Sequence, residues 1–376
     1  MPEFRASHCT RFRYRYSECR RCADACPHEA ISLSDEGASL VADKCKNCGL
    51  CISACHTHAW SSPDFKPIDI LRDAIKAPAF SMACEPSGCR ADAVVPCLGA
   101  IDAVWLAYMA KRRIPVSLHG SGHCQECVHG KTGAEQLRLN LEAVDVLAAA
   151  QRAGMTEDAP EPEWAMPCLV NDARPTSARQ TSQVKSAASD ARRSLFGRLF
   201  RSKPDKATLQ AKASRPPQMS VSAIRAGPYM VSDQRELLQI VCKQKVDRSF
   251  TVPWAENLPL MQLSLQPGCT LCEACFRVCP TGAIGIEQNP NDWALTFQAD
   301  RCVACEVCLE VCQPRVLDAQ TSIDARPGQP AITLIKQAMQ RCSRCDRHFV
   351  SPTPQKTCTI CSDDEDAFTA IFGTAD

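Results

Sequence analysis

The spacing of the cysteines constrains this chain more than any other feature of its sequence. Of its 376 residues, 27 are cysteine, and most are separated from the next by two or three residues. The longest pattern is Cys269-x2-Cys272-x2-Cys275-x3-Cys279-Pro280, and Cys302-x2-Cys305-x2-Cys308-x3-Cys312 follows it. Three thiolates on a tight loop can bind three corners of one cubane, while the fourth points to a neighbouring cluster. The spacing therefore predicts a pair of [4Fe–4S] clusters.

A second copy of this arrangement lies near the N-terminus. One of its two motifs is complete, namely Cys45-x2-Cys48-x2-Cys51-x3-Cys55. The other is Cys19-x2-Cys22-x3-Cys26-Pro27, and Tyr16 stands where its first cysteine is expected. The nearest upstream cysteine is Cys9, so we expect an insertion between Cys9 and Cys19. Both copies also contain Cys-Pro-x-x-Ala-Ile, at residues 26–31 and 279–284, which indicates an internal repeat.

The chain therefore resembles the two-cluster bacterial ferredoxin family twice, over about residues 5–60 and 260–317. The resemblance implies ligand sets that cross between the two motifs of each copy. In the C-terminal copy these sets are Cys269, Cys272, Cys275 and Cys312, and Cys302, Cys305, Cys308 and Cys279. In the N-terminal copy they are Cys9, Cys19, Cys22 and Cys55, and Cys45, Cys48, Cys51 and Cys26. A disulfide framework is the alternative, but such frameworks are typical of short secreted domains.

The composition places the chain in a reducing compartment. Hydrophobic residues make up 45% of the sequence, but cysteine is counted among them. Small cysteine-rich units bury too little apolar surface to fold alone, so metal binding is expected to supply much of their stability. No run reaches the roughly eighteen apolar residues of a membrane span, and the sequence begins without an apolar signal segment. We expect a soluble cytoplasmic protein with reduced thiols.

The fold class predicted from the sequence is α+β, in five segments. Residues 1–66 and 229–320 are the two ferredoxin-type units, and residues 67–165 form a small α/β domain between them. Residues 166–228 are a disordered basic linker, and residues 321–376 resemble a zinc ribbon. In the α/β segment, apolar patterns predict strands near residues 79–83, 93–97 and 114–118, and helices near 69–75, 101–112 and 131–152.

The linker carries the strongest local charge. Formal net charge is +1 overall, but residues 172–225 contain twelve Lys or Arg against three Asp or Glu. Within them, residues 192–203 alternate basic side chains with Leu195, Phe196, Leu199 and Phe200. This pattern predicts a helix that docks on a partner or on an anionic membrane surface, and the alternative is a solvated linker with an incidental apolar cluster. A nucleic-acid partner has no recognition motif to support it.

A different group of cysteines lies in the α/β segment, at predicted strand ends and turns. Its members are Cys84, Cys89, Cys97, Cys124 and Cys127. Residues 79–154 resemble the delta subunit of methyl-viologen-reducing hydrogenase, with a strand that ends in Cys and Gly, a Gly/His/Cys-rich turn and a following helix with Ala134 and Arg138. The resemblance implies a [2Fe–2S] cluster. The Cys124-x2-Cys127 spacing is tighter than in that family, so zinc and plain buried thiols remain as alternatives.

The C-terminal cysteines form two knuckles, Cys342-x2-Cys345 and Cys358-x2-Cys361. Such pairs suit a tetrahedral Zn²⁺, and the same four thiolates can also hold a single iron. Cys168 and Cys242 are left over and are expected to be ordinary thiols. Histidines near the cysteines could tune a cluster or replace a ligand: His56, His58, His119, His123 and His129.

The motifs together predict a multi-cluster electron-transfer protein without a catalytic site of its own. The sequence has no dinucleotide fingerprint, no P-loop and no nucleophile triad. By resemblance, such chains are accessory or electron-shuttling subunits of a cytoplasmic formate dehydrogenase, another molybdopterin enzyme or a hydrogenase. Its partners would be the donor and acceptor proteins. The alternatives are a maturation factor for a metalloenzyme and a redox-sensing regulator.

Overall fold

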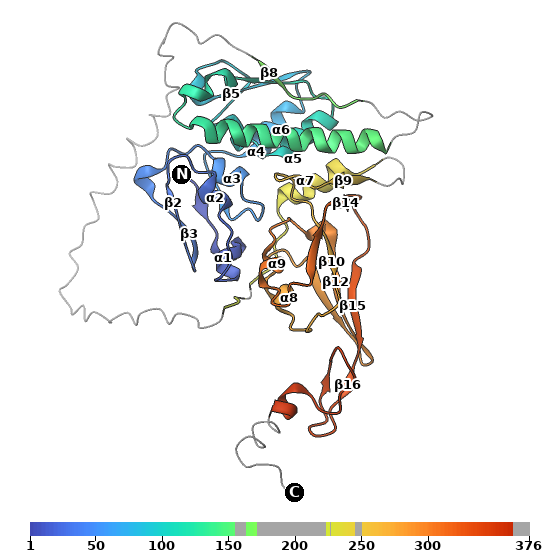
Figure 1. Cartoon of the computed structure of the whole chain (residues 1–376). Helices are drawn as coiled ribbons and strands as arrows, with labels where there is room; N and C mark the ends of the chain where they lie inside the picture. Colours follow the sequence, from blue (N-terminus) through green and yellow to red (C-terminus); the bar gives the residue numbers. More distant parts are fainter. Residues whose placement is uncertain (155–162, 171–222, 226, 245–249, 364–376) are drawn as a thin grey trace, which may run out of the picture. The chain divides into compact units, whose positions relative to one another are not determined.

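The computed structural model describes residues 1–154, 163–170, 223–225, 227–244 and 250–363 (Figure 1). The chain divides into two compact units, one of residues 1–174 and 223–376 and the other of residues 175–222. The second unit lies outside the described residues, and so does the predicted amphipathic helix 192–203. The described part contains both helices and strands, so its class is α+β, as predicted.

Residues 1–61 form a small unit of short elements. Strand β1 (Glu3–Phe4) pairs antiparallel with β4 (Trp60–Ser61) and joins the two ends, and β2 (Ile31–Ser34) forms a hairpin with β3 (Gly37–Leu40). The helices are single turns: α1 (Thr10–Arg13), α2 (Arg21–Asp24) and α3 (Leu50–Ser53), with 3-10 turns η1 (Ala6–His8) and η2 (Ala42–Lys44). One-turn helices and two-residue strands are not stable by themselves, so this unit depends on what its side chains bind.

The α/β segment is built on a four-stranded parallel sheet of order β6-β5-β7-β8. Its strands are β5 (Phe80–Cys84), β6 (Ala93–Val95), β7 (Val116–His119) and β8 (Cys168–Val170). Helices α4 (Pro67–Ala74), α5 (Ala103–Lys111) and α6 (Gly130–Ala153) accompany it, with 3-10 turns η3 (Glu85–Ser87), η4 (Leu98–Ala100) and η5 (Ser121–Glu126). The predicted strands and helices are therefore present, and Met82, Leu106 and Leu118 are among the fully buried side chains of the core.

Both ends of the predicted linker 166–228 are structured. Strand β8 pairs parallel with β7 and so extends the sheet beyond residue 165. At the other end, Ile224 forms a β-bridge with Tyr14. The buried guanidinium of Arg13 donates hydrogen bonds to the carbonyls of Gly227 (3.1 Å) and Pro228 (2.5 Å). The segment is thus attached to the folded unit on both sides of the residues that are not described.

The C-terminal part carries the second set of cysteines between short strands. Strands β10 (Gln262–Leu265) and β13 (Leu317–Gln320) pair antiparallel, as do β9 (Thr251–Pro253) and β14 (Ser322–Asp324). A three-stranded sheet has the order β11-β12-β15, from β11 (Ile284–Gln288), β12 (Asp292–Phe297) and β15 (Ile332–Ala338). Helices α8 (Ala274–Val278) and α9 (Val307–Val311) pack on each other, and η7 (Ala299–Arg301) precedes the second motif. Strands β16 (Gln340–Arg341) and β17 (His348–Phe349) form a final hairpin.

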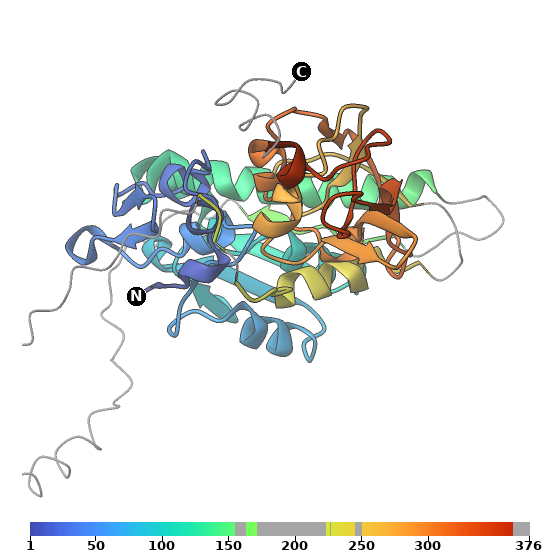
Figure 2. The ribbon, with the colours of Figure 1, turned by 90° about the horizontal axis from the view of Figure 1, so that it is seen from below.

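Helix α7 (Asp233–Cys242) belongs to the core of the α/β segment and not to the ferredoxin-type strands that follow it. Its buried Leu238 and Val241 lie in one apolar cluster with α5 and α6, and Phe250 and Val252 join the same cluster. The turned view in Figure 2 shows α7 (yellow) and α6 (green) among the elements of this part. The sequence-based boundary at residue 229 thus separates elements that share a core.

No helix in the described part of the chain is long and apolar enough to cross a membrane.

Asp102 is expected to stabilise α5 through its cap and to cost stability through its charge. Its carboxylate accepts hydrogen bonds from the backbone N–H groups of Val104 (2.9 Å) and Trp105 (3.3 Å). Burial raises the pKa of this carboxyl above its usual 3.8, so the folded state loses stability as pH rises from about 4 through the folded-state pKa.

Asp102→Ala should lower the free energy of unfolding by about 1–2 kcal/mol, because the cap is lost. Asp102→Asn keeps the cap without the charge, so the stability of this variant relative to the native chain should rise between about pH 4 and pH 7.5. Thermal unfolding followed by circular dichroism at the two pH values measures both effects. An Asn variant that is as unstable as the Ala variant at pH 7.5 would contradict this account.

Candidate iron–sulfur and metal centres

Four thiols of the C-terminal part line one pocket. Three come from the loop before α8 and from its first turn, and the fourth is the residue that directly follows α9. Apolar side chains, among them Leu271, Leu295 and Leu317, complete the lining. We call this group the Cys269 site, and its members are Cys269, Cys272, Cys275 and Cys312. It is the crossed set that the ferredoxin resemblance implies.

The remaining thiols of the second motif form a neighbouring group, the Cys279 site. Its members are Cys279, Cys302, Cys305 and Cys308. Burial raises the pKa of Cys302 to about 12. The pKa of Cys308 is raised well above 9, by burial first and then by the charges of Cys305, Cys302 and Cys279. Cys279, Cys302 and Cys308 also lie in one buried apolar cluster.

The N-terminal unit repeats the pocket. We call its first group the Cys9 site, and its members are Cys9, Cys19, Cys22 and Cys55. Phe4, Leu33 and Trp60 also line this pocket. Burial raises the pKa of Cys9 to about 11 and that of Cys22 to about 12. Cys9, although ten residues before Cys19, thus lies with the three other thiols of its expected set.

The second group of this unit is the Cys26 site, whose members are Cys26, Cys45, Cys48 and Cys51. The pKa of Cys51 is raised by burial first, and then by the charges of Cys48, Cys22, Cys26 and Cys45. Burial raises the pKa of Cys48 as well, and the charges of Cys26 and Cys45 add to the effect. Cys51 also packs in one apolar cluster with Cys22, Cys26 and Cys55, so it is a near neighbour of both groups in its unit.

The chemistry of these donor sets fits iron–sulfur clusters. Four thiolates together repel one another, and burial adds to the cost of their charge. A cation bound at the centre reverses this cost, because each thiolate then faces positive charge, and binding is coupled to loss of the protons. A set of four thiolates is also the ligand set that a cubane takes.

Backbone N–H groups point at the sulfur of the last cysteine in three of the four motifs. The N–H of Ala30 donates to Cys26 Sγ, that of Ala59 to Cys55 Sγ and that of Ala283 to Cys279 Sγ, each at 3.3 Å. Each donor follows its cysteine by four residues. Hydrogen bonds to sulfur stabilise the anionic form and are one means by which a protein sets a cluster's reduction potential.

Left-handed backbone positions recur at the same places in the four motifs. The third residue after each final cysteine has a positive φ: Glu29 (48°), His58 (51°), Gly282 (66°) and Arg315 (52°). Three motifs also have positive φ on both sides of their second cysteine, at residues 47 and 49, 271 and 273, and 304 and 306. The Cys19–Cys22 loop lacks this pattern, which agrees with its altered sequence. Most of these residues are not glycine, so only their positions relative to the cysteines could have identified them.

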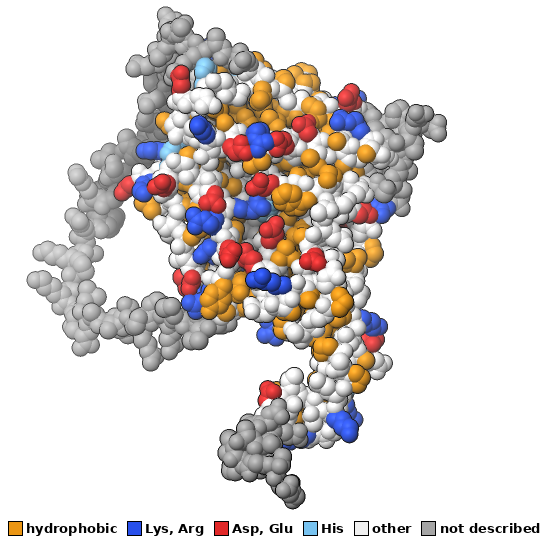
Figure 3. Space-filling model, viewed as in Figure 1, with side chains coloured by type: hydrophobic (Ala, Val, Ile, Leu, Met, Phe, Trp, Pro, Cys, Tyr) orange, Lys and Arg blue, Asp and Glu red, His pale blue; other side chains and the backbone are white. Residues whose placement is uncertain are grey.

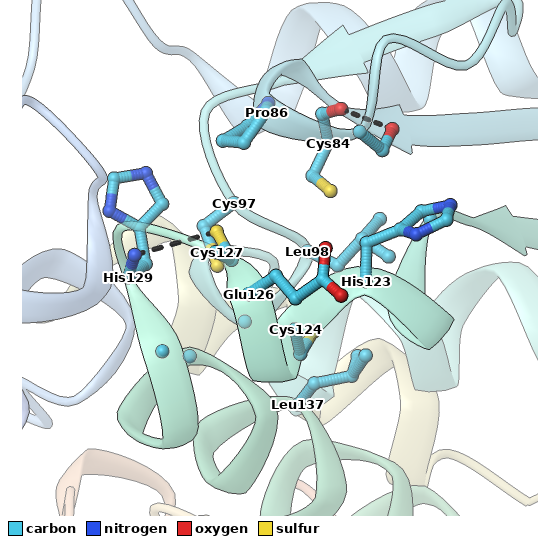
Figure 4. Close-up of a pocket in the computed structure, with 15 residues that line it drawn as sticks. Cys84, Pro86, Cys97, Leu98, His123, Cys124, Glu126, Cys127, His129 and Leu137 are labelled. Atoms are coloured by element: carbon cyan, nitrogen blue, oxygen red, sulfur yellow. Dashed lines mark hydrogen bonds between the residues drawn. The ribbon is translucent and has the colours of Figure 1, made fainter. Parts of the chain in front are cut away.

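The thiols of the α/β segment meet where its parallel strands end. Cys84 ends β5, Cys97 follows β6, and η5, which begins two residues after β7, carries Cys124 and leads to Cys127. The carboxyl ends of parallel strands lie at one edge of a sheet, which is where ligands bind in such folds. Figure 4 shows these four side chains around one pocket, and we call them the Cys84 site.

Two glycines allow the elements around Cys97 to approach each other. A Cβ on Gly99 would lie 2.6 Å from the carbonyl oxygen of Gly133, and a Cβ on Gly133 would lie 3.0 Å from Cys97 Sγ. Helix α6 thus begins against η4. Burial, with the charges of Cys48, Cys84 and Cys124, raises the pKa of Cys97 to about 12.

Three other cysteines lie outside these groups. Cys89 is partly buried but is not among the residues that line the Cys84 pocket, so the structure brings together four of the five predicted thiols. Cys168 is exposed on β8. Cys242 is buried in the core around α7, where burial raises its pKa to about 12.

The C-terminal knuckles bring their four sulfur atoms together, and we call this group the Cys342 site. The Sγ atoms of Cys342, Cys345, Cys358 and Cys361 all lie within 4.8 Å of one another, with 3.7 Å between those of Cys345 and Cys358. The backbone N–H groups of Cys345 and Cys358 lower the pKa of Cys342 to about 6. A thiolate is therefore available near neutral pH, which favours metal binding.

A histidine pair links two of the thiol groups. His28 Nε2 and His129 Nδ1 are 3.1 Å apart, and both rings lie within 4.8 Å of Cys48 Sγ by their nearest ligand atoms. His129 also lines the Cys84 pocket. His28 did not stand out in the sequence, and its place two residues after Cys26 is the one signal that could have identified it.

The other histidines have varied surroundings. His56 is buried against Ala304, and its pKa is lowered to about 3 by burial and by the charge of Arg21. His58 bonds to Gln234, and His119 to Ser117 Oγ at 3.1 Å. His123 lines the Cys84 pocket, and its buried Nε2 has no hydrogen-bond partner among the described residues.

Replacing Arg315 by glycine tests whether the left-handed backbone at this residue, three positions after Cys312, is strained. Arg315 is exposed, so Arg315→Gly removes little contact but relieves a backbone strain of about 1 kcal/mol. We expect the midpoint for thermal loss of visible absorbance to rise by about 2 °C under anaerobic conditions at one scan rate. Gln313→Gly is the matched control, because Gln313 is exposed but has no positive φ, and its midpoint should not rise. Equal shifts in the two variants would refute the strain.

Two segments of the chain are similar to one known domain family. Residues 17–59 and 268–316 each match the family model of the 4Fe-4S dicluster domain. The first match begins after Cys9, so that residue lies outside it, and the matches leave the rest of the chain uncovered. No curated protein matches the chain. With two segments similar to two-cluster ferredoxin-type domains, the chain is an iron–sulfur electron-transfer protein.

Proposed function

We propose that this chain conducts electrons through four [4Fe–4S] clusters and one [2Fe–2S] cluster, and that a Zn²⁺ ion holds its C-terminal knuckles. The observation that carries the proposal is the composition of two pockets. Each is lined by a complete crossed set of four thiols, one in the N-terminal unit and one in the C-terminal part. The Cys9, Cys26, Cys269 and Cys279 sites would each hold one cubane.

The protein around these sites is suited to holding an extra electron. A cluster takes up one electron at a time, and its potential depends on burial, nearby charge and hydrogen bonds to sulfur. The N–H groups of Ala30, Ala59 and Ala283 would donate to ligand sulfur in three of the four cubane sites. Exposure differs between the sites, since Cys272 is exposed while Cys302 and Cys308 are buried. We therefore expect the cubanes to have distinct potentials.

The Cys84 site suits a [2Fe–2S] cluster, which takes four cysteine ligands. Four thiols line the pocket, and Cys89 is left aside as an ordinary thiol. The buried Nε2 of His123, which lacks a partner among the described residues, could donate a hydrogen bond to sulfur in this pocket. We assign Cys84, Cys97, Cys124 and Cys127 as its ligands.

The Cys342 site suits zinc in a structural role. With Zn–S bonds of about 2.3 Å, a tetrahedron has edges of about 3.8 Å. The 3.7 Å between the Sγ atoms of Cys345 and Cys358 is close to this edge. The knuckles and the short β16–β17 hairpin have a core of little more than their own cysteines and Phe349, so the ion would hold the segment together. A single iron is the other occupant that these ligands accept.

We propose redox protein subunits as the donor and the acceptor, in a cytoplasmic oxidoreductase system. The resemblance of the α/β segment to a hydrogenase subunit supports a hydrogenase, and a formate dehydrogenase or another molybdopterin enzyme is the related choice. A nucleic-acid partner has less support, because acidic and basic side chains are interspersed on the face seen in Figure 3. Membrane contact through residues 192–203 rests on sequence alone.

The metal content of anaerobically purified protein tests this function. We expect about eighteen iron atoms per chain, from four cubanes and one [2Fe–2S] centre, with matching sulfide and one zinc. Stepwise reduction followed by low-temperature EPR should then show several reducible signals. About eight irons or fewer, without a signal from the N-terminal unit, would contradict the proposal and favour a maturation role. Salt-dependent DNA binding would instead favour a regulator.

Two serine variants test the ligands of the middle cluster. Cys97→Ser should abolish the [2Fe–2S] EPR signal and lower the iron content by about two atoms, because one of four ligands is lost. Cys89→Ser should keep both, since Cys89 does not line the pocket. Loss of the signal in the Cys89 variant would make Cys89 a ligand and remove one of the four assigned here.

A further inference from the structure

We propose that the five cluster sites form one unbranched series, in the order Cys84 site, Cys26 site, Cys9 site, Cys279 site, Cys269 site. Electrons would then enter and leave at the two ends, and the N-terminal unit would be the middle of the path. This order rests on the proposed function, since it assumes that the sites hold clusters. Different parts of the chain meet at two places, and the contacts there join the sites in this order.

The first junction joins the Cys84 site to the Cys26 site. Cys97 and Cys48 lie in one buried cluster with Leu50. A Cβ on Gly99, beside Cys97, would be 2.9 Å from Leu50 Cδ2, so α3 of the N-terminal unit reaches the start of η4. The charge of Cys48 is also the first neighbouring charge that raises the pKa of Cys97. One ligand of each site therefore faces a ligand of the other.

Histidines bridge the same junction. The hydrogen bond between His28 and His129, at 3.1 Å, connects the loop after Cys26 with the loop after Cys127. The N–H of His129 in turn donates to Cys127 Sγ at 3.4 Å. This gives a hydrogen-bonded path from one ligand sulfur to the neighbourhood of the other site. Asn140 on α6 fixes the contact further, because its amide donates to Ser53 Oγ at 3.3 Å.

The second junction joins the Cys9 site to the Cys279 site. Cys305, a ligand of the Cys279 site, lines the pocket of the Cys9 site. The charge of Cys19 contributes to the raised pKa of Cys305. Around this contact His56 Nδ1 lies 3.3 Å from the carbonyl oxygen of Ala304, and the N–H of Glu18 donates to Glu310 Oε1 at 3.3 Å. The N-terminal and C-terminal cluster sites thus touch directly.

The crossed motifs supply the two remaining steps. In the N-terminal unit, Cys51 packs in one apolar cluster with Cys22 and Cys55 of the Cys9 site. In the C-terminal part, Cys308 lies in one cluster with Cys269, Cys275 and Cys312 of the Cys269 site. The thiols that line the pocket of the Cys269 site all belong to its own set. The Cys269 site, with its exposed Cys272, is therefore one end of the series.

Each step along the series moves one electron. The site that the electron leaves is oxidised by one equivalent, and the next site is reduced by one equivalent, with no bond made or broken. A one-electron donor protein at one end and a one-electron acceptor protein at the other complete the balance. Either direction of flow satisfies the same geometry.

Redistribution of a single electron after flash reduction tests the order. A photogenerated flavin radical reduces the full-length protein at well below one electron per chain, and freeze-quench EPR follows the electron to the site of highest potential. In the native protein we expect one first-order rate that does not change with protein concentration. A variant that lacks the Cys9 site (Cys9→Ser with Cys19→Ser) has a gap in the series, so electrons on one side of the gap must cross to another protein molecule. The observed rate of this slower redistribution should double when the protein concentration doubles.

Two further variants keep the test decisive. Cys302→Ser with Cys305→Ser removes the other junction site and should break the series in the same way, even if the first variant does not fold. Cys269→Ser with Cys272→Ser removes an end site, so first-order redistribution among the other four sites should persist. Iron analysis confirms that each variant has lost about four atoms.

A concentration-independent rate in both junction variants would overturn the order while leaving electron transfer intact. A native protein without reducible signals would instead overturn the proposed function, so the two failures can be told apart.

Discussion

Repulsion among buried thiolates is the constraint on which the rest of the structure depends. Each proposed centre gathers four sulfur atoms in apolar surroundings, and several of these thiols have a pKa raised by burial and by one another. Without a cation, burial and mutual repulsion favour the neutral thiols in the cubane sites. When a cation binds, its attraction to the four thiolates replaces their mutual repulsion. The free energy of binding then also stabilises the folded state. This explains how one-turn helices and two-residue strands can maintain a defined structure around each set.

The sequence predicted much of this because cysteine spacing and apolar periodicity are local signals. The predicted helices at 101–112 and 131–152 correspond to α5 and α6, whose apolar positions recur at helical spacing. What it could not predict depends on distant partners. An apolar face on α7 does not identify the core it joins, and the boundary at residue 229 separated it from that core. Gly88, with φ +68°, turns the chain just before Cys89, the one thiol of its group outside the pocket.

The contact between His28 and His129 is the clearest case of information that sequence alone does not hold. The two residues are 101 positions apart. Each lies beside a cysteine motif, and the spacing of the cysteines accounts for that motif without the histidine. The same is true of Cys19 and Cys305, which belong to different copies of the repeat. Spacing within a motif identifies candidate ligands, but contacts between motifs decide which sites are neighbours.

The position of the N-terminal unit has a consequence for biosynthesis. This unit is synthesised before the segments that cover it, since residues near 97–129 cover its Cys26 site and residues near 304–310 cover its Cys9 site. Both pockets are therefore open on one side until later parts of the chain have been made. A cluster would reach the first unit most easily during that interval, before the later residues cover the two pockets.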